Sequence, residues 1–153
     1  MQMDVCVRPA AVDEGERLRE IAIAAKASWG YDLELVRKWA EMGDFSPAGI
    51  RQKQVFVASV GKNPVGWVAA IARGDVLWLD DLWVEPAWMG KDIGTLLFEH
   101  VVRLGRRSRA TRMEWEAEPN AVAFYEKMGG RYLRDGELSA WGRANPVMGL
   151  DLS

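Results

Sequence analysis

Residues 82–97 read LWVEPAWMGKDIGTLL, and the predicted fold is built outward from them. Apolar side chains lead into Pro86, a short loop with glycine follows, and Ile93, Leu96 and Leu97 then recur at helical spacing. The stretch therefore predicts a strand, a loop and the start of a helix. Backbone N–H groups at a helix start, with the helix dipole behind them, can bind a phosphate group. An ordinary strand-to-helix turn is the alternative interpretation.

The sequence on both sides of this stretch predicts further strands and helices. Alternating or β-rich segments between turn residues predict strands over 3–8, 55–60, 66–73, 76–84, 112–118, 131–138 and 146–152. Apolar residues at helical spacing predict helices over 13–28, 33–42, 93–104 and 121–128. The order β-α-α-β-β-β-α-β-α-β-β predicts an α/β fold with three layers and a mixed central sheet. Residues 76–118 are expected to form a parallel strand–helix–strand crossover.

The two leading helices have predicted caps and a predicted buried face. Asp13, with a glutamate three residues later, predicts a capping box at the start of the first helix. Asp32 is the predicted cap of the second helix. In that helix, Leu35, Trp39 and Met42 follow helical spacing and are predicted to share one apolar face.

Composition restricts the class of protein. The chain has 153 residues, of which 49% are hydrophobic and 27% charged, so we expect one globular domain over residues 1–153. A formal net charge of -2 disfavours binding to nucleic acid or to a membrane surface. One cysteine and one histidine disfavour a disulfide framework and a metal centre, so no metal is expected. The lack of a long apolar run and of a secretory signal predicts a cytoplasmic protein.

A second motif follows the predicted helix over 93–104. Residues 118–129 of this motif read EPNAVAFYEKMG. Together the two motifs resemble those of the GNAT superfamily of N-acetyltransferases, whose acyl-CoA motif runs roughly L-x-V-x-P-x-x-[RQ]-x-x-G-x-[GA]. Leu82, Val84, Pro86 and Gly94 match this motif. Residues 118–129 match the second family motif, [DE]-P-N-A-x-x-F-Y-x-x-x-G. The predicted order of elements is also that of the family, so the resemblance covers nearly the whole chain.

The resemblance implies that the chain transfers an acetyl group from acetyl-CoA, as co-substrate, to a primary amine by direct attack. A small-molecule amine is favoured over a peptide amine. The implied acyl-CoA site consists of Leu82, Trp83, Val84, Met89, Gly90, Lys91, Asp92, Ile93, Gly94, Thr95, Asn120, Phe124 and Tyr125. Met89 replaces an Arg or Gln of the family, and Asp92 replaces a glycine. These two departures leave a non-catalytic acyl-CoA-binding or sensing protein as the alternative.

Acetyl transfer to an amine needs two groups that handle protons. The resemblance places Tyr125 near the CoA sulfur, where its phenol can donate a hydrogen bond to the departing thiolate. A tyrosine that only packs in the core is the alternative. The resemblance also implies that the pantetheine arm of acetyl-CoA lies in a gap between the predicted strands 76–84 and 112–118. Asp81 and Glu116 lie on these two strands, so they are the candidate general bases. A water relay is the third alternative.

The acceptor site is expected where aromatic residues interrupt the predicted elements. Trp29 and Tyr31 separate the two leading helices, and Trp141 lies between the last two strands. In the family these regions form opposite walls of the acceptor site. Aromatic faces with acidic groups nearby suit a cationic amine with an apolar body, whereas core packing is the alternative for each ring. The expected partners are acetyl-CoA and an amine, with no nucleic acid and no membrane, and the resemblance allows a homodimer.

Overall fold

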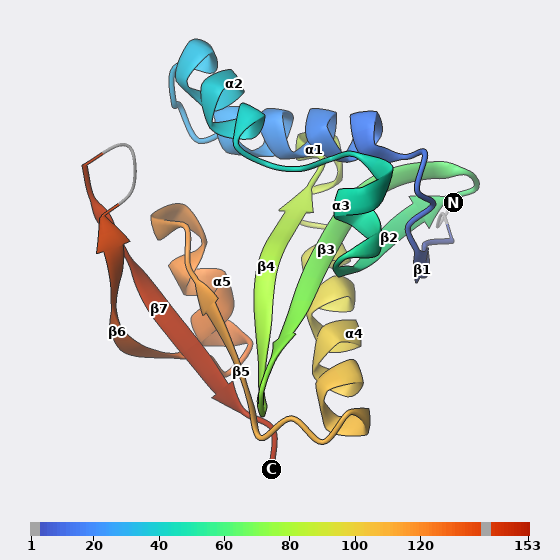
Figure 1. Cartoon of the computed structure of the whole chain (residues 1–153). Coiled ribbons are helices and arrows are strands. Elements are labelled where there is room, and N and C mark those ends of the chain that lie inside the picture. Colours follow the sequence, from blue (N-terminus) through green and yellow to red (C-terminus); the bar gives the residue numbers. More distant parts are fainter. Residues whose placement is uncertain (1–3, 139–141) are drawn as a thin grey trace. The chain divides into compact units, whose positions relative to one another are not determined.

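The computed structural model describes residues 4–138 and 142–153, and Figure 1 shows its helices and strands. The helices are α1 (Gly15–Ala27), α2 (Leu33–Glu41), α3 (Pro47–Arg51), α4 (Ile93–Arg107) and α5 (Val122–Lys127), with two short 3-10 turns, η1 (Pro86–Trp88) and η2 (Pro119–Ala121). The strands are β1 (Cys6–Pro9), β2 (Gln54–Val60), β3 (Asn63–Arg73), β4 (Val76–Val84), β5 (Arg112–Glu116), β6 (Arg131–Leu138) and β7 (Ala144–Asp151). The predicted order of elements is confirmed, with α3 as an addition.

Within the described residues, the strands form one seven-stranded mixed sheet in the order β1-β2-β3-β4-β5-β7-β6. β4 and β5 are parallel and are joined through α4, which confirms the predicted crossover. The pairs β1–β2, β2–β3, β5–β7 and β6–β7 are antiparallel. The predicted mixed α/β fold is therefore confirmed. No helix in this described part of the chain is long and apolar enough to cross a bilayer.

The chain divides into two compact units. The first comprises the residues up to Ala70 together with Asp81–His100, and the second comprises Ile71–Asp80 together with Val101–Ser153. Each of β3, β4 and α4 therefore contributes one part to the first unit and one part to the second.

In the first unit, α1 packs its apolar face against β2 and β3. The residues predicted for this face are all buried, namely Leu18, Ile21, Ala22 and Ala25. They share a core cluster with alternate residues of the two strands, Val55, Val57, Trp67 and Ala69. Trp67 also donates its indole N–H to the carbonyl oxygen of Leu18 at 2.9 Å, so this large side chain is buried with its polar atom paired.

The opposite face of β2 and β3 in this unit is covered by the first turns of α4. The ring centroids of Phe56 and His100 lie 4.4 Å apart. A Cβ atom built on Gly66 would lie 3.0 Å from a methyl carbon of Ile93 and 3.2 Å from a methyl carbon of Leu97. Glycine at this position therefore permits the close approach of helix and strand. Helices on both faces of the strands give the three layers that the sequence predicts.

The predicted cap at the start of α1 is wrong. The helix begins at Gly15, after the cap residue Glu14, and no side chain caps its first turn. The Glu14 carboxylate instead accepts two hydrogen bonds of 2.8 Å from the guanidinium of Arg8 and a third of 2.8 Å from the backbone N–H of Ala11. This arrangement holds the turn before the helix, so Asp13 is not needed as a cap.

The predicted face of α2 is confirmed at Trp39, which packs against the core cluster, but is wrong at Leu35 and Met42, and the predicted cap is confirmed. Asp32 accepts a hydrogen bond from the backbone N–H of Leu35 at 3.4 Å. Leu35 itself is exposed and Met42 is 68% exposed, whereas Val36 and Ala40 are buried. The buried residues Val36 and Ala40 lie one helical turn apart, and spacing alone did not distinguish this stripe from the neighbouring one.

In the second unit, the remaining turns of α4 pack against β4 and the end of the chain. A Cβ atom built on Gly105 would lie 2.6 Å from a methyl carbon of Leu152 and 3.3 Å from one of Leu77. Leu77 pairs in register with Met113 of β5, and Met113 is fully buried. The apolar residues of β5 thus form the core of this unit, as its alternating sequence predicts.

The second unit also contains a buried carboxylate on β5. Glu114 is only 3% exposed, and it accepts hydrogen bonds from Arg112 Nε and, at 2.9 Å, from Arg134 of β6. Burial by itself raises the pKa of Glu114, but the hydrogen bonds from Arg134 and Arg112 outweigh it and hold the pKa below its ordinary value of 4.5. The carboxylate is therefore ionised and paired at neutral pH.

Replacing Glu114 with glutamine should destabilise the protein in a pH-dependent way. Because the pKa is lowered by folding, the ionised group stabilises the fold above its ordinary pKa, and this contribution is lost as the pH falls through the folded pKa. Glu114→Gln should lower the free energy of unfolding by about 1–3 kcal/mol at pH 7 in urea denaturation, and the effect should shrink as the pH is lowered below 4.5. Glu116→Gln, an exposed change on the same strand, is the control. An equal effect of both variants would contradict the assignment.

Candidate active site

The predicted strand, loop and helix around residues 82–97 are confirmed in the first unit. β4 ends at Val84, η1 follows, and α4 begins at Ile93. Ile93 is 1% exposed, whereas the four residues before it are all exposed, namely Met89, Gly90, Lys91 and Asp92. Leu82, Val84, Gly94 and Thr95 are half-buried at the two ends of the stretch. Residues 89–92, which we call the phosphate loop after the role that the sequence predicts for them, therefore lie in solvent directly before a helix start.

The backbone of the phosphate loop is left-handed at two positions. Gly90 has a φ of 77° and Asp92 a φ of 65°. Glycine adopts this conformation freely, whereas most side chains pay about 1–2 kcal/mol, and Asp and Asn tolerate it best. The carbonyl of Asp92 accepts the N–H of Leu96 at 3.0 Å, so Asp92 also begins the hydrogen-bond ladder of α4. The conformation at Asp92 gives a physical reason why the family motif has glycine there. Turns of this kind form concavities that bind anions.

Four aromatic side chains form a cluster in the same unit, and three of them lie around a buried ammonium group. We call Trp29, Tyr31, Trp39 and Trp83 the aromatic cluster. Lys26 is 6% exposed, and its Nζ lies 4.6 Å from the ring centroid of Trp39, 5.3 Å from that of Tyr31 and 5.8 Å from that of Trp83. The Trp83 ring lies 5.1 Å from Trp39 and 6.1 Å from Trp29. The structure thus brings Trp29 and Tyr31 together and places a protein cation on the cluster.

The candidate base Asp81 lies beside this cluster. Its Oδ1 accepts a hydrogen bond of 3.0 Å from the indole N–H of Trp83, two residues along β4. Asp81 is half-buried and Trp83 is buried. The indole therefore orients the carboxylate of Asp81 on the face of the strand that carries the aromatic cluster.

Three predicted site residues belong to η2 and α5 in the second unit. Tyr125 is 7% exposed, and its ring lies 5.0 Å from that of Trp115 and 5.2 Å from that of Phe124. Asn120 donates its side-chain amide to Glu118 at 2.8 Å, which orders the turn before α5. The helix is followed by Gly129, whose φ of 97° is left-handed and ends the helix as glycine commonly does.

The other candidate base, Glu116, lies at the exposed end of β5 in the second unit. Its carboxyl carbon is 3.3 Å from the position of a Cβ built on Gly136, so the side chain lies along β6. Trp141, the third predicted acceptor residue, lies outside the described residues.

One surface pocket lies apart from the predicted site residues, and the part of the chain that the structure describes holds no metal-ligand cluster. Among the described residues, no group of three or more His, Cys, Asp or Glu side chains is placed to hold a metal ion. A pocket of about 380 Å³ lies on the second unit, lined in part by Arg112, Arg131 and Asp151. None of the predicted site residues lines it, so it lends no support to the predicted acetyl-transfer site.

The sequence model of the acetyltransferase (GNAT) family matches residues 16–130. The chain belongs to this family. The match confirms the resemblance that the two motifs indicate. Acetyl-CoA-dependent acetyl transfer is the general reaction of GNAT enzymes. A comparison with curated protein sequences gives no match.

Solved structures of GNAT enzymes share the fold of this acetyltransferase. A GCN5-related N-acetyltransferase from Rhodopseudomonas palustris is 24% identical with a TM-score of 0.80, and the alignment covers 99% of this chain and 98% of that one. PaiA N-acetyltransferase from Thermoplasma acidophilum, solved in complex with coenzyme A, is 16% identical with a TM-score of 0.82 over 97% and 99% of the chains. The ribosomal-protein-S18-alanine N-acetyltransferase from Escherichia coli is 15% identical with a TM-score of 0.73 over 98% and 95%.

Lys26 and Trp39 both belong to the surroundings of the aromatic cluster in this acetyltransferase, but neither was predicted from the sequence as a site residue. Lys26 follows Leu18 and Ala22 at intervals of four residues, so it lies on the buried stripe of α1. A lysine at that position was the available signal of a buried cation. Trp39 was assigned to the apolar face of α2, and its contact with Trp83 could not be read from local spacing.

Substitutions of Asp92 should show that its backbone conformation favours glycine. Asp92→Gly should change the free energy of unfolding by less than about 1 kcal/mol, because glycine adopts the left-handed conformation without strain and is nearly as good a cap. Asp92→Val should destabilise by roughly 2 kcal/mol, because a β-branched residue is strained there. Urea denaturation of the two variants measures both values. Equal stability of the glycine and valine variants would contradict a left-handed residue 92.

Proposed function

We propose that this acetyltransferase transfers the acetyl group of acetyl-CoA to a primary amine of a small molecule by direct attack. The observation that carries the proposal is the exposed phosphate loop, with left-handed backbone at Gly90 and Asp92 directly before α4, inside the matched family region. The fold similarity to PaiA N-acetyltransferase, which was solved with coenzyme A, supports this choice of co-substrate. We further propose that residues 1–153 form one catalytic domain.

The proposed role of the phosphate loop is to bind the pyrophosphate of acetyl-CoA. Backbone N–H groups of residues 89–95 and the positive end of the α4 dipole supply the attraction. Lys91 adds a positive charge, and its Nζ lies 5.9 Å from the ring centroid of Trp88. Met89 adds no polar contact, and the Asp92 carboxylate opposes the anion. Leu82, Trp83 and Val84 of β4 are proposed to lie along the pantetheine arm, with Asn120 and Phe124 as further contacts.

The proposed chemistry moves one proton at each end of the reaction. The neutral amine attacks the thioester carbonyl, the carbon–sulfur bond then breaks, and the products are an amide and coenzyme A. Tyr125 is proposed to donate its phenolic proton or a hydrogen bond to the departing sulfur. Asp81, Glu116 or a water relay removes the proton of the amine. The hydrogen bond from Trp83 favours Asp81 because it orients that carboxylate.

The proposed acceptor site includes Trp29, Tyr31 and Trp141. The flat faces of Trp29 and Tyr31 suit an apolar acceptor body, and Lys26 already contributes an ammonium group to the aromatic cluster. The ammonium of Lys26 would repel a cationic acceptor amine placed on the same rings, so we favour acceptors whose amine lies away from the rings. A peptide amine is the alternative acceptor.

A second candidate function is acyl-CoA binding or sensing without catalysis. It is favoured by the carboxylate of Asp92 and the apolar side chain of Met89 in the phosphate loop. Both candidates share the proposal of a cytoplasmic location. The net charge of -2 supports the further proposal that neither nucleic acid nor a membrane is a partner. A homodimer is proposed only by analogy with the family.

A binding assay followed by a turnover assay should separate the candidates. Acetyl-CoA should raise the melting temperature, because a ligand that binds only the folded state stabilises it. Release of CoA thiol should then be measured over a panel of small primary amines and N-terminal or lysine peptides. We expect turnover with a small amine. Binding without turnover on any acceptor supports the sensor, and no thermal shift contradicts both candidates.

Tyr125→Phe should slow the reaction without unfolding the protein. Loss of the phenolic group should lower kcat by roughly tenfold to a thousandfold, the usual contribution of a positioned acid. The matched control is Tyr132→Phe, which removes the hydroxyl of an exposed tyrosine that bonds Asp135 at 2.9 Å. It should leave kcat unchanged. Full activity of Tyr125→Phe would return Tyr125 to a packing role beside Trp115.

A further inference from the structure

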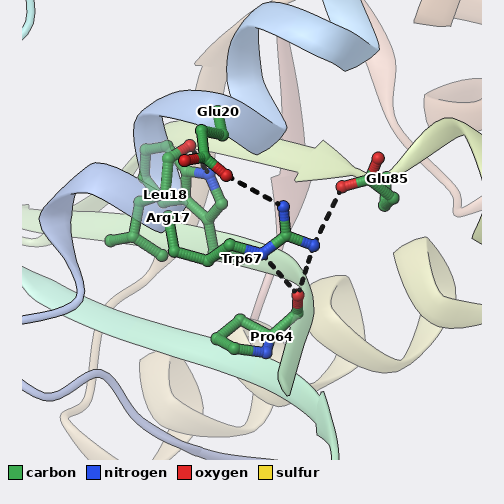
Figure 2. Close-up of polar contacts among 6 residues, drawn as sticks. All are labelled: Arg17, Leu18, Glu20, Pro64, Trp67 and Glu85. Carbon is green, nitrogen blue, oxygen red and sulfur yellow. Dashed lines mark hydrogen bonds and ion pairs between the residues drawn. The ribbon is translucent and has the colours of Figure 1, made fainter.

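One arginine of α1 contacts both the β2–β3 hairpin and the residue that leads into the phosphate loop (Figure 2). Arg17 Nε and Nη2 both donate to the carbonyl oxygen of Pro64, at 3.2 Å and 3.0 Å. Nη2 also lies 3.1 Å from Oε2 of Glu85, and Nη1 lies 3.4 Å from Oε2 of Glu20. The side chains of Arg17 and Glu85 are 30% and 24% exposed, whereas that of Glu20 is 64% exposed. The ion pair with Glu85 is therefore the better protected of the two.

Glu85 is held at its backbone as well as at its carboxylate. Its N–H donates to the carbonyl oxygen of Val65 at 2.9 Å. Along the hairpin, Ala58 pairs with Gly66 but Ser59 pairs with Pro64, so Val65 is an extra residue on β3. A bulge of this kind changes the direction of the chain locally. Two successive carbonyls, of Pro64 and Val65, thereby become the acceptors for Arg17 and for Glu85.

The attachment of Glu85 fixes one end of the phosphate loop. Glu85 directly precedes η1, and the exposed residues 89–92 follow. The other end is fixed by the burial of Ile93. Since residues 89–92 between these two anchors are exposed, we infer that the anchors determine which backbone conformation the loop keeps. A planar guanidinium is suited to such a task because its fixed fork donates to the carbonyl of Pro64 while its charge lies in ion-pair range of Glu85.

We propose that Arg17 is a positioning residue for acyl-CoA binding, acting through Glu85 to hold the phosphate loop in its anion-binding conformation. The same ion pair offsets the negative charge of Glu85 on the N-terminal side of the loop. This inference rests on the proposed function, because it requires that the phosphate loop binds acetyl-CoA. Arg17 itself touches neither substrate nor reacting atoms.

Calorimetric titration with coenzyme A tests the role of Arg17. Arg17→Met keeps the alkyl chain and the helix but removes every donor, and Glu85→Ala removes the partner. Each variant should weaken coenzyme A binding by about tenfold, a typical effect of a contact that positions a binding group. The double variant should bind no more weakly than either single variant, because both break one interaction. Arg17→Lys should restore part of the affinity.

Steady-state kinetics separates positioning from a general loss of structure. The variants of Arg17 and Glu85 should raise the KM for acetyl-CoA by a similar factor and leave kcat and the amine KM within about twofold. Two controls break other contacts in α1 or at the residue just before it. Arg8→Met removes the paired hydrogen bonds to Glu14, both 2.8 Å, and Glu20→Ala removes the exposed partner of Arg17. Both controls should keep the wild-type affinity for coenzyme A.

The affinities of the wild-type protein and its variants for coenzyme A show whether Arg17 positions the phosphate loop. If wild-type protein binds coenzyme A and both Arg17→Met and Glu85→Ala bind it equally well, Arg17 does not position the loop and the proposed function stands. An equal loss in Arg8→Met would mean that any damage to α1 weakens binding, which overturns the specific role. If the wild-type protein does not bind coenzyme A, the proposed function fails first. Should Arg17→Met not fold, Arg17→Lys and Glu85→Ala give the same test.

Discussion

The turn from β4 into α4 has to pass through left-handed backbone, and much of the first unit is organised around that requirement. Gly90 and Asp92 take the two positive φ angles, and Ile93 is buried immediately afterwards. The strand before the turn is attached through Glu85 to the bulged hairpin and to α1. Gly66 allows α4 to approach the sheet closely enough to complete the anchor. Left-handed backbone in an exposed loop persists when the surrounding structure holds it, and here the residues on both sides of the loop are buried or paired.

Each unit also contains a charge that is buried with specific partners. In the first unit the ammonium of Lys26 lies over the rings of Trp39, Tyr31 and Trp83. In the second unit the carboxylate of Glu114 is paired with two arginines. A buried charge is tolerated when partners replace its hydration, and it then fixes the geometry of those partners. The aromatic cluster is thus a defined arrangement of rings, which bears on how an acceptor can be held.

Much of the fold could be predicted because its signals are local. β4 was predicted with its observed bounds, and the stripe of α1 from Leu18 to Ala25 is buried as expected. The errors occurred where a tertiary contact replaced a local one. Glu14 pairs with Arg8, so no capping box forms at Asp13. The short helix α3 has its signal in Ser46 as cap and proline at the first turn, but five residues are too few to show a helical period.

The sequence by itself determined the element order, the two family motifs and the place of the phosphate loop, because turn residues and apolar spacing act over a few neighbouring positions. Only the tertiary structure decided which distant side chains meet. Arg17 reaches Pro64, 47 residues further along the chain, and the rings around Lys26 come from a loop, from α2 and from β4. Such contacts depend on strand register and helix packing, which bring these residues together through many weak interactions at once. No single segment of sequence encodes them.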